Sequence, residues 1–234
     1  MNSVINRPNQ SSLTATDWQR FIDAVDKTHG IGATAPAYRD FVRVHVRAMD
    51  PSDPTSMSWG VHSMSGMRGR NFLPWHRWFV RQMERRLRKI HATVVIPYWD
   101  AITDRAIPAA LAKPALLTRW SVTRNWKASQ LARSADLTAA MSMGTFTSFQ
   151  TTVEGVVHGS VHNAVGGDMA SASSPADPLF WLHHANLDRL WSQWQVTHPG
   201  QDPSNLAEVL QPTPIFGVKV AKVRTISGLG YRYT

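Results

Sequence analysis

Two adjacent histidines lie in a very apolar stretch of the chain, DPLFWLHHANLDRLW, which runs from Asp177 to Trp191. Apolar residues on two overlapping helical stripes predict that both His183 and His184 are buried. A buried imidazole without a partner costs free energy, because its nitrogens lose their hydrogen bonds to water. The chain therefore has to fold around a group that engages these rings, either a polar partner or a metal ion. Neighbours on a helix point about 100° apart, so we do not expect both to bind one ion.

A second pair of histidines has the spacing of metal ligands on a helix. In VEGVVHGSVHNAVGG, the residues Glu154, His158 and His162 follow one another at intervals of four. Residues four apart share one face of an α-helix, so both imidazoles can reach one ion. Zinc proteases use the same spacing as H-E-x-x-H, but here no glutamate lies between the histidines. Taken alone, this pattern is weak evidence for a metal site.

The absence of cysteine narrows the choice of ligands. Thiolate metal sites, disulfides and a cysteine nucleophile are excluded, so any metal must be held by His, Asp or Glu. The N-terminal half offers His45 on an expected helix, His62 in an expected loop and His76 at the start of another helix. Sites made of imidazole nitrogen alone favour copper or zinc. Three histidines in each half of the chain therefore indicate two histidine-only sites.

Helical periodicity dominates the chain and predicts five helices, at about 13–29, 38–49, 74–91, 147–163 and 179–197. Thr16 and Gln19 are expected to form a capping box on the first of them. Residues 50–70 are expected to form a loop, and the chain after Pro214 is expected to be β-like. No internal repeat or linker-like composition divides the 234 residues. We therefore expect one mainly α domain over residues 1–234, with short β segments near the C-terminus.

Charge and hydropathy weaken several other classes of function. The net charge of +9 raises the idea of nucleic-acid binding, but the basic run Arg77–Lys89 has an apolar helical stripe and no nucleic-acid motif accompanies it. A solvated helix face is the favoured interpretation of that run. No long apolar run predicts a membrane span, and the N-terminus lacks the apolar segment of a secretory signal. We expect a cytoplasmic protein without nucleic-acid or membrane partners; export through a helper protein and the oligomeric state stay open.

Two long motifs resemble the copper-binding signatures of the tyrosinase family. They are NFLPWHRWFVRQME, from Asn71 to Glu84, and DPLFWLHHANLDRLW, in the family's order and with H-x-x-x-H between them. IPYWD and VGGDM resemble further family segments, and the final Tyr231 and Tyr233 resemble a Tyr-x-Tyr motif that packs against an N-terminal arginine, here Arg7. The family covers tyrosinases, catechol oxidases and aminophenol oxidases, with haemocyanins as distant relatives. The resemblance implies a helical bundle that holds a dicopper centre, in a catalytic core without a lid domain.

The resemblance also assigns the copper ligands. The residues matched to the first copper are His45, His62 and His76, and those matched to the second are His158, His162 and His184. In the family the second histidine of the HH pair is the ligand, so His183 is expected to be a buried histidine with a polar partner. Thirteen residues separate His62 from His76, more than in many relatives. Many relatives join this loop histidine to a cysteine through a thioether, which cannot form here. Asp188, one turn after His184, is expected to orient the ligating ring.

The implied activity is oxidation of o-diphenols to o-quinones, with two copper ions as cofactor and O₂ as co-substrate. Hydroxylation of monophenols is expected to be weaker. In hydroxylating members, a water held by a glutamate and an asparagine has been proposed to deprotonate the phenol. Glu154 matches the glutamate, Gly159 stands where the asparagine would be, and Asn163 would replace it only in part. Ser171 matches a position at which some relatives block the second copper with an aromatic ring, so we expect an open site for small phenols.

Other hypotheses stay open from the sequence. They are an oxygen carrier like haemocyanin, an o-aminophenol oxidase, a zinc hydrolase and a basic interaction module whose histidines are incidental. A zinc hydrolase would need a glutamate beside the paired ligands, which is missing. Metal analysis combined with a catechol turnover assay separates these hypotheses.

Overall fold

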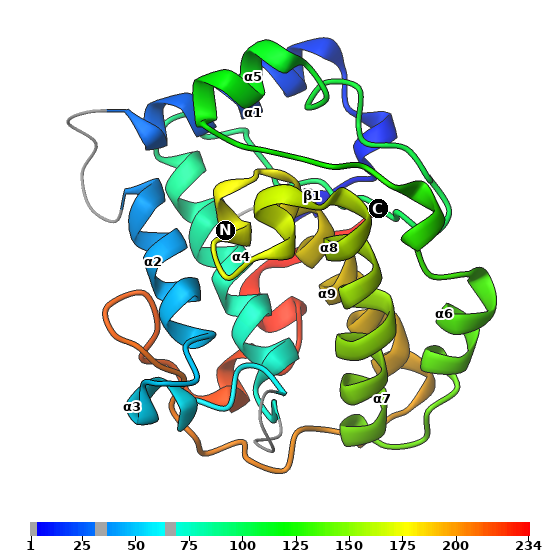
Figure 1. Ribbon diagram of the computed structural model, residues 1–234. Helices are drawn as coiled ribbons and strands as arrows, with labels where there is room; N and C mark the ends of the chain where they lie inside the picture. The colour runs from blue at the N-terminus through cyan, green and yellow to red at the C-terminus, as the bar shows by residue number, and fades with distance from the viewer. Residues whose placement is uncertain (1–3, 31–36, 64–68) are drawn as a thin grey trace.

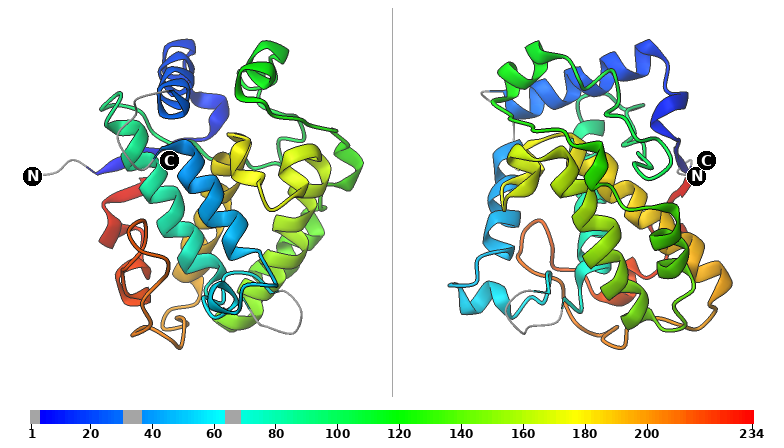
Figure 2. Two further views of the ribbon diagram at one scale, coloured as in Figure 1. Left: turned by 60° about the vertical axis from the view of Figure 1, so that its left-hand side comes forward. Right: turned by 45° about the vertical axis from the view of Figure 1, so that its right-hand side comes forward.

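Four helical segments form the body of the protein, in a computed structural model that describes residues 4–30, 37–63 and 69–234. They are α2 (Tyr38–Ala48), α4 (Phe72–Arg88), α9 (Leu179–Thr197) and a continuous helix made of α7 (Phe146–Thr152), η3 (Val153–His158) and α8 (Gly159–Val165). Two further helices, α1 (Ala15–His29) and α5 (Pro114–Trp120), lie across one end of them (Figures 1 and 2). The predicted mainly helical fold is confirmed.

Shorter elements connect these helices. They are α3 (Pro54–Met57), α6 (Ser134–Met141) and the 3₁₀ turns η1 (Gln10–Ser12), η2 (Ala128–Gln130), η4 (Gly167–Ala170), η5 (Ser174–Ala176), η6 (Val220–Val223) and η7 (Ser227–Leu229). Helix α3 interrupts the region that the sequence predicted to be loop, and residues 64–68 of that region lie outside the described residues.

Helix α9 is the central element of the fold. Every residue from Leu179 to Asp188 is buried, which explains why its sequence is apolar on all sides rather than along one stripe. Because protein surrounds this helix, His183 and His184 are each only 1% exposed even though adjacent side chains point in different directions. Neither α9 nor any other helix of the described residues is both long and apolar enough to cross a membrane.

Aromatic contacts hold α2 and α4 against α9. The ring of Phe79 on α4 lies 5.6 Å from that of Phe41 on α2 and 4.8 Å from that of Trp181 on α9. The basic run on α4 is only partly the solvated face that the sequence predicted, because Arg77 and Arg86 are 1% and 5% exposed. Arg77 is buried because its guanidinium pairs with Asp188 on α9 and stacks on a tryptophan ring.

The two ends of the chain meet in a parallel pair of short strands, β1 (Ile5–Arg7) and β2 (Tyr231–Tyr233). Arg7 is fully buried and its guanidinium lies 3.7 Å from the centre of the Tyr231 ring. It also donates two hydrogen bonds, of 3.0 and 2.9 Å, to the carboxylate of Glu84 on α4. The predicted packing of Arg7 on the Tyr-x-Tyr motif is confirmed, and it ties both chain ends to the bundle.

Two local predictions are wrong for identifiable physical reasons. The β-like tail expected after Pro214 is limited to β2, and the chain before it forms the 3₁₀ turns η6 and η7. Its buried residues Val220 and Val223 are three apart, the period of a 3₁₀ helix, instead of two. The N-terminus of α1 is capped by Thr14 and Asp17 instead of Thr16 and Gln19. Thr14 precedes the first helical residue, so its side chain can accept the Asp17 amide hydrogen while the Asp17 carboxylate accepts that of Thr14.

Candidate metal centre

The first group of histidines comes from three separate segments. His45 lies on α2, His62 in the segment before α4, and His76 on α4. Their ring centres are 5.1 to 5.8 Å apart, and one nitrogen of each lies within 4.8 Å of the others. The Nε2 atoms of all three are buried and have no hydrogen-bond partner. Three unsatisfied nitrogens that converge on one point are the arrangement that a metal ion would satisfy.

Main-chain carbonyls fix the orientation of two of these rings. The Nδ1–H of His45 donates to the carbonyl of Ala172 at 2.7 Å, and that of His76 donates to the carbonyl of Phe72 at 2.8 Å. A neutral imidazole that carries its proton on Nδ1 has a free lone pair on Nε2. Metal-binding histidines are commonly held in this way by an acceptor for their other nitrogen. The sequence could not reveal these carbonyls, because any residue type supplies one.

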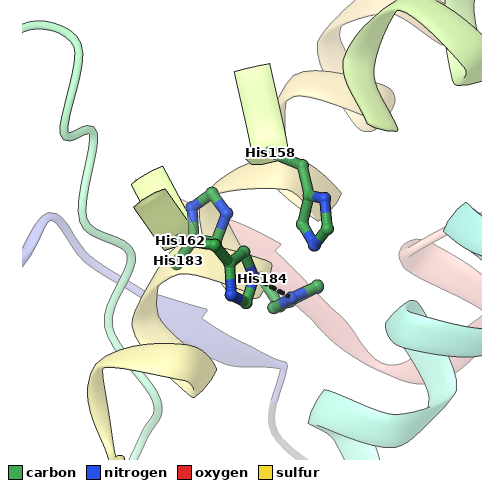
Figure 3. A group of neighbouring side chains, drawn as sticks. All are labelled: His158, His162, His183 and His184. Atoms are coloured by element: carbon green, nitrogen blue, oxygen red, sulfur yellow. Dashed lines mark hydrogen bonds between the residues drawn. The ribbon is translucent and has the colours of Figure 1, made fainter. Parts of the chain in front are cut away.

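The second group consists of four histidines, which Figure 3 shows side by side. They are His158 in η3, His162 on α8, and His183 and His184 on α9, with one nitrogen of each within 4.8 Å of the others. The Nδ1–H of His158 donates to the carbonyl of Glu154 at 3.0 Å, and that of His162 donates to the carbonyl of Met169 at 2.5 Å. The Nε2 atoms of His162 and His184 face each other at 3.4 Å.

The HH pair differs from the sequence prediction. His183 was expected to have a polar partner. The main chain of His158 is its polar neighbour, although neither ring nitrogen has the geometry of a hydrogen bond to a described residue. One nitrogen of His183 also lies within 4.8 Å of a nitrogen of His158, His162 and His184, which is close enough to share an ion. The sequence prediction was that neighbours on a helix, about 100° apart, would not bind the same ion. His184 has a different set of neighbours: its ring stacks 4.2 Å from His76 of the first group and 4.0 Å from Phe180. His184 therefore lies between the two groups, whereas the ring contacts of His183 are all with the second group.

The helix that carries Glu154, His158 and His162 is not a regular α-helix. The segment Val153–His158 is a turn of π-helix between α7 and α8. A π turn contains an extra residue and is often found at functional sites. The sequence spacing predicted that Glu154, His158 and His162 share one face of a regular helix. In the structure the two imidazoles do lie together, whereas the carboxylate of Glu154 accepts a hydrogen bond from the main chain of Ser63, next to His62.

Burial favours the neutral form of six histidines in the two groups. Desolvation lowers the pKa of His45, His76, His158, His183 and His184 well below the usual value of 6.5, with repulsion between neighbouring imidazoles acting in the same direction. Burial also lowers the pKa of His162 to about 4. At neutral pH a metal ion would therefore meet neutral imidazoles and would not have to displace protons.

A cavity of about 190 Å³ opens onto both groups. Four histidines line it: His45, His62, His158 and His162. Gly159 and Asn163, which the sequence linked to the missing asparagine, and Ser171, which it linked to substrate access, line the same cavity. A larger cavity of about 620 Å³ lies beside Phe41 and Arg85, and no histidine is among its described lining residues. The chemistry of the lining, rather than the volume, identifies the smaller cavity as the candidate site.

Asp188 does not have the role that the sequence predicted. Its carboxylate accepts hydrogen bonds from Arg77, Arg7, and the hydroxyls of Tyr231 and Tyr233, the last two at 2.6 Å. The Nδ1 atom of His184 makes no hydrogen bond to it or to any other described residue. Asp188 faces away from the histidines because two buried arginines require a counter-charge on that side of α9.

Two phenylalanines near the candidate metal ligands were missed in the sequence. Phe72 lies four residues before His76, and Phe180 lies four residues before His184, at ring distances of 4.8 and 4.0 Å. Both rings pack between the two histidine groups, since Phe72 also lies 4.8 Å from His158 and Phe180 lies 5.1 Å from His45. The signal was present, because each copper-binding motif has a phenylalanine on the helical face of its histidine.

The donor set fits copper. All candidate ligands are imidazoles, with no thiolate and no carboxylate oxygen converging on the same points among the described residues. Imidazole nitrogen suits copper and zinc ions, and two adjacent groups can hold a pair of ions. The close contact between His76 and His184 joins the two groups into one double site.

Known proteins are similar to this chain in sequence and in fold. Residues 35–119 and 108–197 match the family model for the common central domain of tyrosinase. A tyrosinase from Streptomyces lincolnensis is 32% identical over 241 residues, which cover 82% of this chain and 83% of that protein. The structure of a polyphenol oxidase from Grenache grape, Vitis vinifera, matches with a TM-score of 0.79 at 19% identity, over 99% of this chain and 85% of that one. A functional unit of octopus haemocyanin matches with a TM-score of 0.76 at 24% identity, over 98% and 68%.

The family match covers all six histidines that the sequence assigned as copper ligands, five on helices and His62 in a loop. The relative from Streptomyces lincolnensis aligns over most of both chains. The chain therefore belongs to the tyrosinase family of type-3 copper oxidoreductases, which act on phenols.

Proposed function

We propose that this enzyme binds two copper ions and uses O₂ to oxidise o-diphenols to o-quinones. The observation that carries the proposal is the pair of adjacent histidine groups beside one shared cavity, in each of which one nitrogen of every ring lies within 4.8 Å of the others. In the first group the three Nε2 atoms are buried and have no hydrogen-bond partner. In the balanced reaction, two o-diphenols each lose two electrons and two protons, and one O₂ takes up all four of each to form two waters. Bound copper supplies the redox chemistry for this exchange.

The first copper would be held by His45, His62 and His76. The second would be held by His158, His162 and His184. We choose His184 over His183 because its ring lies 4.2 Å from His76 and its Nε2 faces that of His162, so it borders both sites. The carbonyl acceptors on the Nδ1 atoms of four of these six rings, His45, His76, His158 and His162, would hold them in place before a metal arrives.

The cavity favours small phenols. Its volume of about 190 Å³ suits one aromatic ring, and Gly159 and Ser171 leave its mouth free of bulky side chains. Asn163 adds a polar group to the same lining. We infer that a catechol enters here and presents its hydroxyls toward His45, His62, His158 and His162.

Monophenol hydroxylation should be the weaker activity. A phenol has a pKa near 10, like that of tyrosine, so its proton must be removed by a nearby base at neutral pH. General-base catalysis contributes about 10²–10⁴-fold to such a step. Glu154 is the nearest carboxylate to the cavity's histidines in the described structure, but Ser63 engages both of its oxygens, and Gly159 has no side chain to hold a water beside it.

The test combines metal analysis with turnover. Metal-free protein loaded with copper should oxidise catechol with consumption of one O₂ for two catechols. Zinc-loaded protein is the matched control and should be inactive. Reversible binding of O₂ without oxidation of catechol would instead identify an oxygen carrier, and faster turnover of o-aminophenol than of catechol would identify an aminophenol oxidase.

A further inference from the structure

Glu154 lies between the two histidine groups and contacts both of them. Its main-chain carbonyl accepts the Nδ1–H of His158 at 3.0 Å. Its carboxylate, which is 11% exposed, reaches the other group: Oε1 accepts the N–H of Ser63 at 2.7 Å and lies 3.6 Å from Nδ1 of His62. The second oxygen, Oε2, accepts the hydroxyl of Ser63 at 2.8 Å. Both carboxylate oxygens are therefore bound to the residue that follows the loop histidine.

The same hydrogen bonds draw together the ends of the segment after His62. The hydroxyl of Ser63 accepts the N–H of Gly69 at 3.0 Å. A Cβ atom on Gly69 would lie 2.8 Å from Oε2 of Glu154 and 2.9 Å from the main chain of His62, so only glycine allows this approach. Gln150, one turn before Glu154, donates to the Gly69 carbonyl at 2.8 Å. One helix thus holds both ends of this segment.

His62 depends on these contacts more than the other ligands do. The Nδ1–H groups of His45 and His76 donate to main-chain carbonyls, which orient the rings. The described residues provide no such carbonyl for His62, and the group beside its Nδ1 is the carboxylate of Glu154. At 3.6 Å this is an electrostatic contact rather than a hydrogen bond. A carboxylate beside a ligating imidazole orients the ring and increases its basicity.

We propose that Glu154 is a positioning residue that fixes His62 through Ser63 while its main chain holds His158. One residue thereby sets the relative position of a ligand from each copper site. This inference rests on the proposed function, because it takes His62 and His158 as copper ligands. No bond is made or broken by Glu154 in this role.

Three substitutions separate this role from an effect of charge alone. Glu154→Gln keeps an oxygen that can accept the Ser63 N–H and an amide that can donate to the Ser63 hydroxyl, but it removes the charge. Glu154→Ala removes both. Ser63→Ala keeps the charge but removes the hydroxyl that joins Glu154 to Gly69. Val156→Ala, on the exposed side of the same turn, is the matched control.

The first measurement is amide hydrogen exchange in metal-free protein, which does not depend on enzymatic function. The Ser63 amide should exchange at least about tenfold faster in Glu154→Ala than in the wild type, and the Gly69 amide should exchange faster in Ser63→Ala.

Copper titration is the second measurement. Loss of a residue that orients a ligand typically weakens metal binding about 10- to 100-fold, and we expect that loss for one of the two coppers in Glu154→Ala. Glu154→Gln should restore most of the affinity, and Val156→Ala should match the wild type.

Two results would overturn the proposal. One is wild-type exchange at Ser63 together with wild-type copper affinity in Glu154→Ala. The other is an equal loss of copper affinity in Glu154→Gln and Glu154→Ala with none in Ser63→Ala, which would assign the effect to charge alone. If the Glu154 variants do not fold, the exposed-site variant Ser63→Ala tests the proposal alone. Exchange of the Gly69 amide at the wild-type rate in that variant would contradict the hydrogen bond between Gly69 and the Ser63 hydroxyl. A wild-type protein that binds no copper would refute the proposed function but would leave the exchange result to be judged separately.

Discussion

His183 and His184 have the same burial and both lie near His158 and His162, so their other neighbours must distinguish them. His184 contacts His76 of the other group, and His183 does not. We predict that His184→Ala binds one copper per chain, and that His183→Ala keeps two copper ions. His183→Ala should lower the free energy of unfolding by about 0.5–3 kcal/mol, the usual range for a buried substitution. Metal analysis and thermal denaturation of both variants measure these effects. Loss of one copper only in His183→Ala would reverse the assignment.

Gly159 lies on the cavity wall and has room for a side chain. A Cβ atom there would meet only the Glu154 carbonyl, at 3.9 Å, and the backbone is helical with φ −59°. Gly159→Asn should therefore be accommodated and should hold a water near Glu154. We predict a higher ratio of tyrosine hydroxylation to catechol oxidation, and a lower ratio in Glu154→Gln. The two initial rates, measured on the same preparation, give the ratio. An unchanged ratio in Gly159→Asn would mean that another group removes the phenol proton.

Residue patterns located the histidine groups but not the contacts that orient them. The spacing of His158 and His162 and the two motifs around His76 and His184 are local in sequence, so they could be read directly. The carbonyls that hold His45 and His162 belong to Ala172 and Met169, in a loop whose path only the folded chain defines. The partners of Asp188 could not be predicted for the same reason, since Arg7 and Tyr231 lie at opposite ends of the chain and Arg77 lies on another helix.

Among the long helices, sequence periodicity could not predict the π turn η3. A regular helix and a helix with one wider turn have almost the same apolar pattern over seven residues. The bounds of α9 were predicted correctly, because its apolar residues are continuous and Pro199 follows its end. The 3₁₀ turns of the tail were mistaken for strands, since β-branched residues favour strands and only burial shows that every third residue faces the core.

The cap of α1 allows a direct test at the level of one element. Thr14 and Asp17 satisfy each other's main-chain N–H groups at the start of α1. We predict that Thr14→Ala lowers the free energy of unfolding by about 0.5–2 kcal/mol, the usual effect of losing such a cap. Thr16→Ala, two residues away in the same exposed turn, should change it by less than about 0.5 kcal/mol. Chemical denaturation of both variants compares them, and a larger effect for Thr16→Ala would restore the cap predicted from sequence.

Across the whole molecule, the site exists only when distant segments come together. Its candidate ligands come from α2, the segment before α4, α4, the α7–α8 helix and α9. The buried contacts of Arg7 with Glu84 and Asp188 tie the chain ends to the two helices that carry His76 and His184. Although burial opposes its charge, the carboxylate of Glu84 holds the pKa of Arg7 well above its usual value. A change that breaks these buried contacts should therefore unfold the protein and separate the candidate ligands at the same time.

The buried histidines make the metal-free protein sensitive to acid. Burial lowers the folded-state pKa of His45, His76 and His184 far below the value near 6.5 that they have in the unfolded chain. Below pH 6.5 the unfolded chain takes up protons that the folded protein does not, so the free energy of unfolding falls as the pH drops. Above pH 6.5 these histidines are neutral in both states and do not change the free energy of unfolding. Each histidine contributes up to about 1.4 kcal/mol per pH unit. Thermal denaturation of metal-free protein between pH 7.5 and 5 should show a steep fall below 6.5, and a shallower one in His184→Ala. A melting temperature that stays constant over this range would contradict the burial of neutral imidazoles.

The central claim is that six histidines hold two coppers that oxidise o-diphenols. Its most direct test is a titration of metal-free protein with copper, in which bound metal and the rate of catechol oxidation are measured on the same samples. The account predicts that two copper ions bind per chain, and that activity appears only as the second site fills. Saturation at one copper per chain, or full copper loading without oxidation of catechol, would contradict it.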